Sequence, residues 1–274
     1  MLTIAVTILL GGLAIGWIVS EDARTRRRRA QILKTPFPKA WRSILKKRLP
    51  YFKALPTDLQ LQLKKHIQIF IHEKRFIGCN GFEIDDDVRV TIAAQACLLL
   101  LNRETDYYPK LKDILVYPNA FIVKQPQADA NGVVWDHRRI LAGESWGQGK
   151  VILSWTHTLV DAAEPYDGNN VVIHEFAHQL DQEGGQANGA PLLSSITDYP
   201  SWSKVLGEEF AALQHCAAHG LPSIFSYYGA TNPAEFFAVI SEVFFERPEI
   251  FYQQHPALYT ELSHFYRLDP VSWH

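Results

Sequence analysis

The chain has 274 residues, of which 47% are hydrophobic and 20% charged, and its formal net charge at pH 7 is −2. This length and apolar content suffice for one substantial core, which excludes an intrinsically disordered protein. The small net charge argues against direct nucleic-acid binding, because phosphate contacts require clustered Lys and Arg side chains. The three cysteines form no Cys-x-x-Cys pair, so we expect neither a disulfide framework nor a cysteine-bound metal, and a reducing compartment fits best.

An uncharged apolar segment begins the chain. Residues 2–19 are about long enough to cross a bilayer, and a cluster of arginines follows at 24–29. Basic residues beside a membrane span remain on the cytoplasmic side. We therefore expect a single transmembrane helix in residues 1–20, in the inner (cytoplasmic) membrane of a bacterium, with the remainder of the chain in the cytoplasm. A cleaved signal peptide and a buried N-terminal helix are the alternatives.

Prolines mixed with basic residues predict a linker at 21–49, followed by a globular domain at 50–274. Apolar residues at helical spacing predict helices at about 57–75, 86–102, 168–181, 201–219, 233–246 and 256–266. Short β-branched runs predict strands at 114–117, 120–123, 133–135 and 151–155. This order predicts an α+β fold with a small mixed sheet and a helical C-terminal half.

A His-Glu-x-x-His motif lies in the predicted helix at 168–181, at His174, Glu175 and His178. Because residues four apart lie on one face of a helix, the two imidazoles can share a metal ion. Imidazole suits Zn²⁺, and a catalytic zinc takes three protein ligands and a water. Glu175 is then placed to take a proton from that water. The alternative is a pair of core histidines that bond to carbonyls or carboxylates.

The third ligand is expected from the helix at 233–246. Glu235 lies in its first turn among apolar side chains, where a carboxylate is costly to bury without a cation. Glu242 competes for this role, and we expect it instead to accept a hydrogen bond from a metal-bound imidazole. Asp181 is a further candidate for orienting a ligand. His215 and His219 have ligand spacing but no intervening Glu, and we interpret them as an ordinary helix pair.

Three segments together resemble a known family: HEFAHQLD at 174–181, Asn-Gly at 188–189, and SYYGATNPAEFFAVISEVFFE at 226–246. They are similar to the zinc-dependent peptidases typified by Mlc titration factor A, and the similarity extends over most of residues 50–270. The resemblance implies a zincin-like, gluzincin catalytic domain, related in its core to the protease domain of anthrax lethal factor. It implies one Zn²⁺ per chain, held by His174, His178 and Glu235, with Glu175 catalytic.

The resemblance also implies a role for Tyr228, or else its neighbour Tyr227, in stabilising the oxyanion, since a phenol can donate to a developing negative charge. It further implies that an extended substrate pairs with the strand at 150–155. We therefore expect a membrane-tethered zinc peptidase that hydrolyses peptide or protein substrates in an aminopeptidase-like mode. The alternative is a binding protein that sequesters a transcriptional repressor of sugar uptake, with weak or secondary peptidase activity.

Overall fold

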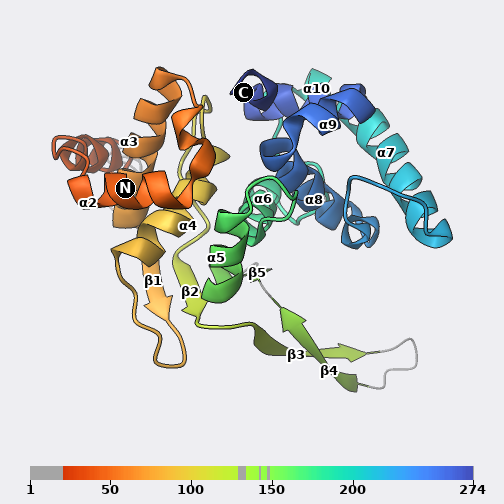
Figure 1. The fold of residues 1–274 in the computed structure, drawn as a ribbon, viewed down its shortest axis with the longest axis horizontal. Helices are drawn as coiled ribbons and strands as arrows, with labels where there is room; N and C mark the ends of the chain where they lie inside the picture. The colour runs from red at the N-terminus through yellow and green to blue at the C-terminus, as the bar shows by residue number, and fades with distance from the viewer. Residues whose placement is uncertain (1–20, 129–133, 142, 147–148, 274) are drawn as a thin grey trace, which may run out of the picture.

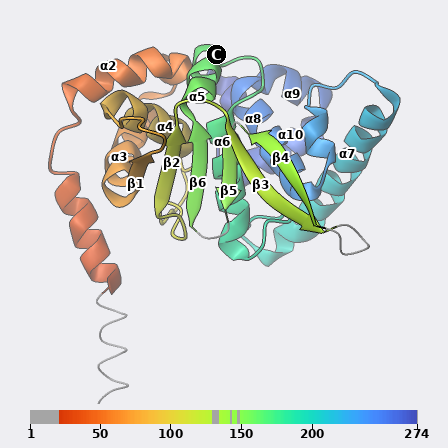
Figure 2. The same ribbon diagram turned by 90° about the horizontal axis from the view of Figure 1, so that it is seen from below.

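The computed structural model describes residues 21–128, 134–141, 143–146 and 149–273. In this part of the chain no helix is both long and apolar enough to cross a bilayer. The expected transmembrane helix, residues 2–19, lies outside the described residues, so the structure lends it no support. The described chain begins with a helix at residues 21–32, drawn in red in Figure 2.

A four-stranded sheet lies at the centre of the fold, with its strands in the order β1-β2-β6-β5 (Figure 2). Its parallel strands are β1 (Arg75–Gly78), β2 (Asp113–Tyr117) and β6 (Lys150–Ser154). The edge strand β5 (Gly143–Trp146) runs antiparallel to β6. A separate antiparallel hairpin is formed by β3 (Phe121–Ala128) and β4 (Val134–Leu141). The predicted mixed sheet is thus confirmed.

Three helices lie on the β1 side of the sheet (Figure 1): α2 (Lys39–Arg48), α3 (Thr57–Glu73) and α4 (Asp86–Leu98). The helix α2 lies inside the segment for which we expected a linker. Its prolines precede the helix, with Pro38 at the N-cap, where proline does not interrupt helical hydrogen bonds. Leu45 of α2 is fully buried, and Trp41 Nε1 donates to Asp86 Oδ2 at 2.8 Å. These contacts attach α2 to the start of α4.

The C-terminal half is helical, as predicted (Figure 1). It contains α5 (Trp155–Ala163), α6 (Val171–Asp181), α7 (Tyr199–His219), α8 (Pro233–Glu246), α9 (Pro248–Gln254) and α10 (Pro256–Tyr266). The bounds predicted for α8 and α10 are confirmed. The helix α5 was not predicted, because its first residue, Trp155, continues the apolar run of β6. Ser154 ends the strand and caps the helix by accepting from the backbone N–H of His157.

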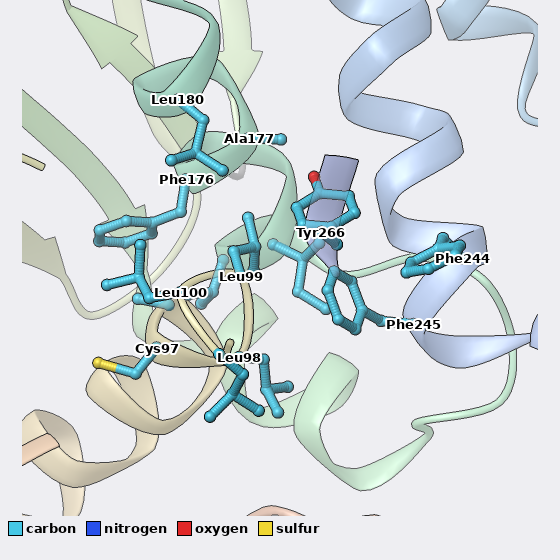
Figure 3. Packing of buried hydrophobic residues seen from close by; sticks show 14 of the residues in the cluster. Cys97, Leu98, Leu99, Leu100, Phe176, Ala177, Leu180, Phe244, Phe245 and Tyr266 are labelled. Carbon is cyan, nitrogen blue, oxygen red and sulfur yellow. The ribbon is translucent and has the colours of Figure 1, made fainter. Parts of the chain in front are cut away.

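The helix α6 is packed on both sides, and Figure 3 shows its Phe176, Ala177 and Leu180 directed toward the core. The Phe176 ring lies 4.9 Å from that of Tyr108 and 5.6 Å from that of Phe70, measured between centroids. The facing helix α4 is buried over nearly all of its surface. Because the apolar face of α6 is held in this way, its rotation is set, and its histidines face away from this apolar side.

Candidate metal centre

The start of α6 is attached to α8 by hydrogen bonds. The side chain of Asn170 caps α6 by accepting from the backbone N–H of Ile173 at 3.0 Å. Its Nδ2 donates to Glu246 Oε1 at 2.8 Å, and its backbone N–H donates to Glu242 Oε2. Asn170, Glu242 and Glu246 are 2%, 7% and 2% exposed. Breaking only some of these hydrogen bonds would leave buried polar groups without partners, which costs free energy. The bonds therefore constrain the two helices relative to each other.

The structure brings His174, His178 and Glu235 together. Oε2 of Glu235 lies 3.0 Å from Nε2 of His174 and 3.2 Å from Nε2 of His178. These residues offer three ligand atoms that all lie within 4.8 Å of one another. Ligands of a tetrahedral zinc at their usual bond lengths are roughly 3.3 Å apart. The separations from Glu235 to the two imidazoles therefore fit a shared metal ion.

The charges of the centre also suit a cation. Burial disfavours the charged form of His174, but the carboxylates of Glu242 and Glu235 outweigh burial and raise the pKa of His174 well above its ordinary value. Burial likewise opposes ionisation of Glu235, yet hydrogen bonds from His174 and His178 prevail and lower its pKa. The carboxylates of Glu235 and Glu242 thus stabilise positive charge at the His174 ring. The same carboxylates can stabilise a bound divalent cation.

Glu242 occupies the position expected from the sequence. Its Oε1 lies 2.8 Å from Nδ1 of His174, the ring nitrogen that points away from Glu235. Its other oxygen accepts from the Asn170 backbone. A carboxylate on the distal nitrogen of a ligating imidazole orients the ring and raises its basicity. Glu242 therefore connects the start of α6 to His174 on the side of the ring opposite to Nε2, the nitrogen that would bind a metal.

Two candidate catalytic side chains flank this group. Glu175 follows His174 on α6 and is 4% exposed. Tyr228 lies in a short 3-10 helix, Tyr227–Ala230, with its ring centroid 5.8 Å from that of His174. The neighbouring Tyr227 directs its hydroxyl to the carbonyl of Leu221 instead. Of the two tyrosines left open by the sequence, Tyr228 is the one beside the histidine.

The role of Asp181 in orienting a ligand stays a prediction. Its Oδ2 accepts from the backbone N–H of Gly189 at 2.8 Å, so it holds the loop that follows α6. His215 and His219 are exposed on α7, and their tilted rings have centroids 4.2 Å apart. They belong to no candidate metal group among the residues that the structure describes.

The expectation that substrate pairs with the strand at 150–155 is wrong. The strand β6 is hydrogen-bonded along one edge to β2 and along the other to β5. An interior strand has no free backbone groups for an added strand. Among the described strands, the outer edge next to β6 belongs to β5, which also packs against α6.

Two further carboxyls near the start of α6 were not predicted from the sequence: Glu246, which is buried, and Asp161, which is partly exposed. Asp161 Oδ2 accepts from the backbone N–H of Val171 at 2.8 Å, and burial raises its pKa to about 7. Burial raises the pKa of Glu246 to about 9. The four-residue spacing of Glu242 and Glu246 places both on one face of α8, and this spacing was the available signal. Glu246 and Asp161 both accept hydrogen bonds from residues at the N-terminal end of α6.

Residues 23–267 match the family model described as glucose-regulated metallo-peptidase M90. The chain belongs to this family. It is 41% identical to the uncharacterized protein slr2042 of Synechocystis sp., over 98% of this chain and 97% of that protein. It is 34% identical to Mlc titration factor A of Enterobacter sp. and 35% identical to that of Salmonella gallinarum, each over 81% of this chain and 84% of the relative.

This membership confirms the resemblance seen in the sequence. A metallo-peptidase requires a metal ion, and the structure offers a His-His-Glu group with suitable spacing and charge. The matched region, 23–267, contains every residue of that group. The family and the geometry thus agree on a metallopeptidase-like protein.

Proposed function

We propose that the chain is a zinc-dependent peptidase in which His174, His178 and Glu235 hold one Zn²⁺. The observation that carries this proposal is the 3.0 and 3.2 Å spacing between Glu235 Oε2 and the two imidazole nitrogens, in a member of a metallo-peptidase family. Two imidazoles and one carboxylate are a typical donor set for catalytic zinc, with a fourth position left for water or substrate. This arrangement corresponds to a gluzincin-like catalytic domain.

A zinc ion bound by this group supplies a water of lowered pKa and a Lewis acid for the peptide carbonyl. Glu175 acts as the general base, taking a proton from the water and delivering it to the leaving amine. Its nearly complete burial favours proton exchange with the reacting groups over exchange with bulk solvent. The Tyr228 phenol donates a hydrogen bond to the carbonyl oxygen as negative charge develops there.

We propose that the substrate is an extended peptide that adds to the outer edge of β5. This edge lies beside α6, and the described residues of β5 that pair with β6 are Gly143–Trp146. We propose an aminopeptidase-like mode for this substrate. Cleavage of amino-acid chromogenic substrates but not of internally labelled, N-terminally blocked peptides is expected. The reverse pattern would indicate an endopeptidase.

A second candidate function rests on the relatives. Several are named Mlc titration factor A, and the match to the Enterobacter protein covers 84% of its length. We therefore propose, as the alternative, that the chain binds a transcriptional repressor of sugar uptake and that its peptidase activity is weak or secondary. The Glu175→Gln variant separates the two functions, because it removes the general base and leaves the exposed surface unchanged.

We also propose that residues 2–19 anchor the chain in the inner membrane, with the peptidase domain in the cytoplasm. The uncharged sequence and the arginines that follow it support this proposal. In the helix at 21–32, Arg24, Arg26, Arg27 and Arg28 are exposed. Fractionation of cells that express the full chain should place it with membranes, and a chain lacking residues 1–20 in the soluble fraction. Recovery of the full chain in the soluble fraction would contradict the anchor.

The first experiment is metal analysis of the purified protein, with peptide hydrolysis assayed in parallel. The wild type should contain one zinc per chain, and His174→Ala and Glu235→Ala should lose both metal and activity. His219→Ala is the matched control, because this exposed histidine also lies on a helix. Glu175→Gln should retain zinc and lose hydrolysis. A wild type that binds no zinc, even when zinc is supplied, would refute the peptidase proposal.

A further inference from the structure

The loop between α6 and α7 approaches the start of α8 at one residue, Gly189. Its φ angle is +77°, in the left-handed region that favours glycine. A Cβ atom at this position would lie 2.4 Å from the carbonyl oxygen of Pro233 and 2.8 Å from its carbonyl carbon. These are backbone atoms at the start of α8, two residues before Glu235. A side chain at position 189 would therefore displace the first turn of α8.

Two hydrogen bonds hold Gly189 in this position. Its N–H donates to Asp181 Oδ2 at 2.8 Å, and its carbonyl accepts from Trp202 Nε1 at 3.0 Å. Asp181 is the last residue of α6 and follows His178 by less than one turn. Trp202 lies on α7, with its ring 6.0 Å from that of Phe237 on α8. Asp181 and Trp202 are each only 2% exposed, so solvent cannot readily replace either bond.

We propose that Asp181, Gly189 and Trp202 form a clasp that sets the distance between His178 and Glu235 and so determines metal affinity. All three are positioning residues, and the inference rests on the proposed metal site. The opposite ends of the two helices are already joined, since Asn170 at the start of α6 bonds to Glu242 and Glu246 of α8. The clasp supplies the second attachment, at the end of α6 and the start of α8.

Two fixed ends are needed because the three ligands are spread along the helices. His174 lies near the attachment at Asn170, whereas His178 and Glu235 lie near Gly189. With the first attachment alone, the helices could pivot and separate Glu235 from His178 while His174 kept its bond to Glu242. Metal ligands held by their surroundings in the bound geometry give tighter binding, and loss of a supporting contact typically weakens it about 10- to 100-fold.

Gly189→Ala tests the clasp, and Gly81→Ala is its matched control. Gly81 has the same φ of +77°, but apart from its chain neighbours no atom of the described residues lies within 4 Å of the position of its Cβ. Both variants therefore incur the same left-handed strain, and only Gly189→Ala forces a methyl group against Pro233. Zinc affinity is measured by competition with a chromophoric chelator. We expect binding to weaken about 10- to 100-fold in Gly189→Ala and to stay at the wild-type value in Gly81→Ala.

Cobalt substitution provides a readout that general destabilisation would not move. The visible absorption spectrum of Co²⁺ reports its coordination. The Gly189→Ala spectrum should differ from that of the wild type, because Glu235 is displaced, while Gly81→Ala should resemble the wild type. If Gly189→Ala does not fold, Asp181→Ala and Asp181→Asn replace it. Removing the acceptor should weaken metal binding, and Asn, which keeps an oxygen for the Gly189 N–H, should restore most of it.

The outcomes distinguish the proposed clasp from the proposed metal site. Equal zinc affinity and equal cobalt spectra in the wild type and all folded clasp variants would overturn the clasp and leave the metal site intact. A wild type that binds no zinc would overturn the metal site and the clasp with it. Weakened binding in Gly189→Ala or Asp181→Ala, with Gly81→Ala and Asp181→Asn close to the wild type, would establish the clasp.

Discussion

Glu246 should impose a pH dependence on the stability of the fold. Its side chain is buried beside the start of α6, where Oε1 accepts from Asn170 Nδ2 at 2.8 Å and Oε2 accepts from the Gly168 N–H at 3.2 Å. Burial, with added repulsion from Asp167 and Glu242, raises its pKa from an ordinary 4.5 to about 9, although the bond from Asn170 opposes the shift. Glu246 is therefore protonated in the folded protein at neutral pH.

The sign of the effect follows from proton binding. Between these two pKa values the folded state holds a proton on Glu246 that the unfolded state releases. The free energy of unfolding therefore falls as pH rises, by about 1.4 kcal/mol per pH unit. The stabilisation is complete below the unfolded pKa and is lost as pH rises through the folded pKa of about 9. From about pH 5.5 to about pH 8 the expected loss is about 3 kcal/mol.

Urea unfolding of the metal-free protein at several pH values in this range measures the effect. Glu246→Gln cannot titrate, so the wild-type free energy of unfolding should fall relative to that of the variant as pH rises, whatever the offset between them. Other ionisable groups contribute equally to both proteins and cancel in the difference. Glu249→Gln is the matched control, because this glutamate on α9 is exposed. Parallel pH profiles for the wild type and Glu246→Gln would refute the reasoning.

Three further predictions concern stability, metal binding and thiol reactivity. Asn170→Ala removes a buried cap and the donor to Glu246, and should lower the free energy of unfolding by about 2–4 kcal/mol. Asn232→Ala removes an exposed cap and should lower it by about 1 kcal/mol. Equal losses of the two variants in urea unfolding would contradict this difference. Glu242→Gln should weaken zinc binding about 10- to 100-fold in a chelator competition, because it alters the hydrogen bond to His174, and unchanged affinity would exclude that role. Burial raises the pKa of the Cys97 thiol, so iodoacetamide should modify the partly exposed Cys79 and Cys216 before it. Early modification of Cys97, seen by mass spectrometry, would contradict its burial.

The elements that were predicted well have local causes. The bounds of α8 follow from Asn232, which caps it, and Pro233, which occupies its first position. Pro256 marks the start of α10 in the same way. The pairing of His174 with His178 is also local, because it depends only on the pitch of one helix. Helix capping and helical spacing depend on interactions between residues within about one turn of each other, so they can be predicted from the sequence.

The short helix α9 shows where local reading fails. Its span, Pro248–Gln254, covers about two turns, which is too short for apolar spacing to distinguish a helix from a loop. Phe251 within it is fully buried, with its ring 5.2 Å from that of Phe225. Packing therefore stabilises a helix that its own sequence only weakly favours.

The sequence by itself determined the chemical types at the candidate metal centre: two histidines and a neighbouring glutamate on one helix, and further glutamates on another. Only the tertiary structure decided which glutamate faces which imidazole nitrogen. Glu235 lies against Nε2 of His174 and Glu242 against Nδ1, contacts between residues more than 60 positions apart. The tertiary structure also decided that Asp181 bonds to Gly189 and that β6 is an interior strand. Such contacts depend on how the helices pack and in what order the strands pair, and neither is encoded in the spacing of residues along one element.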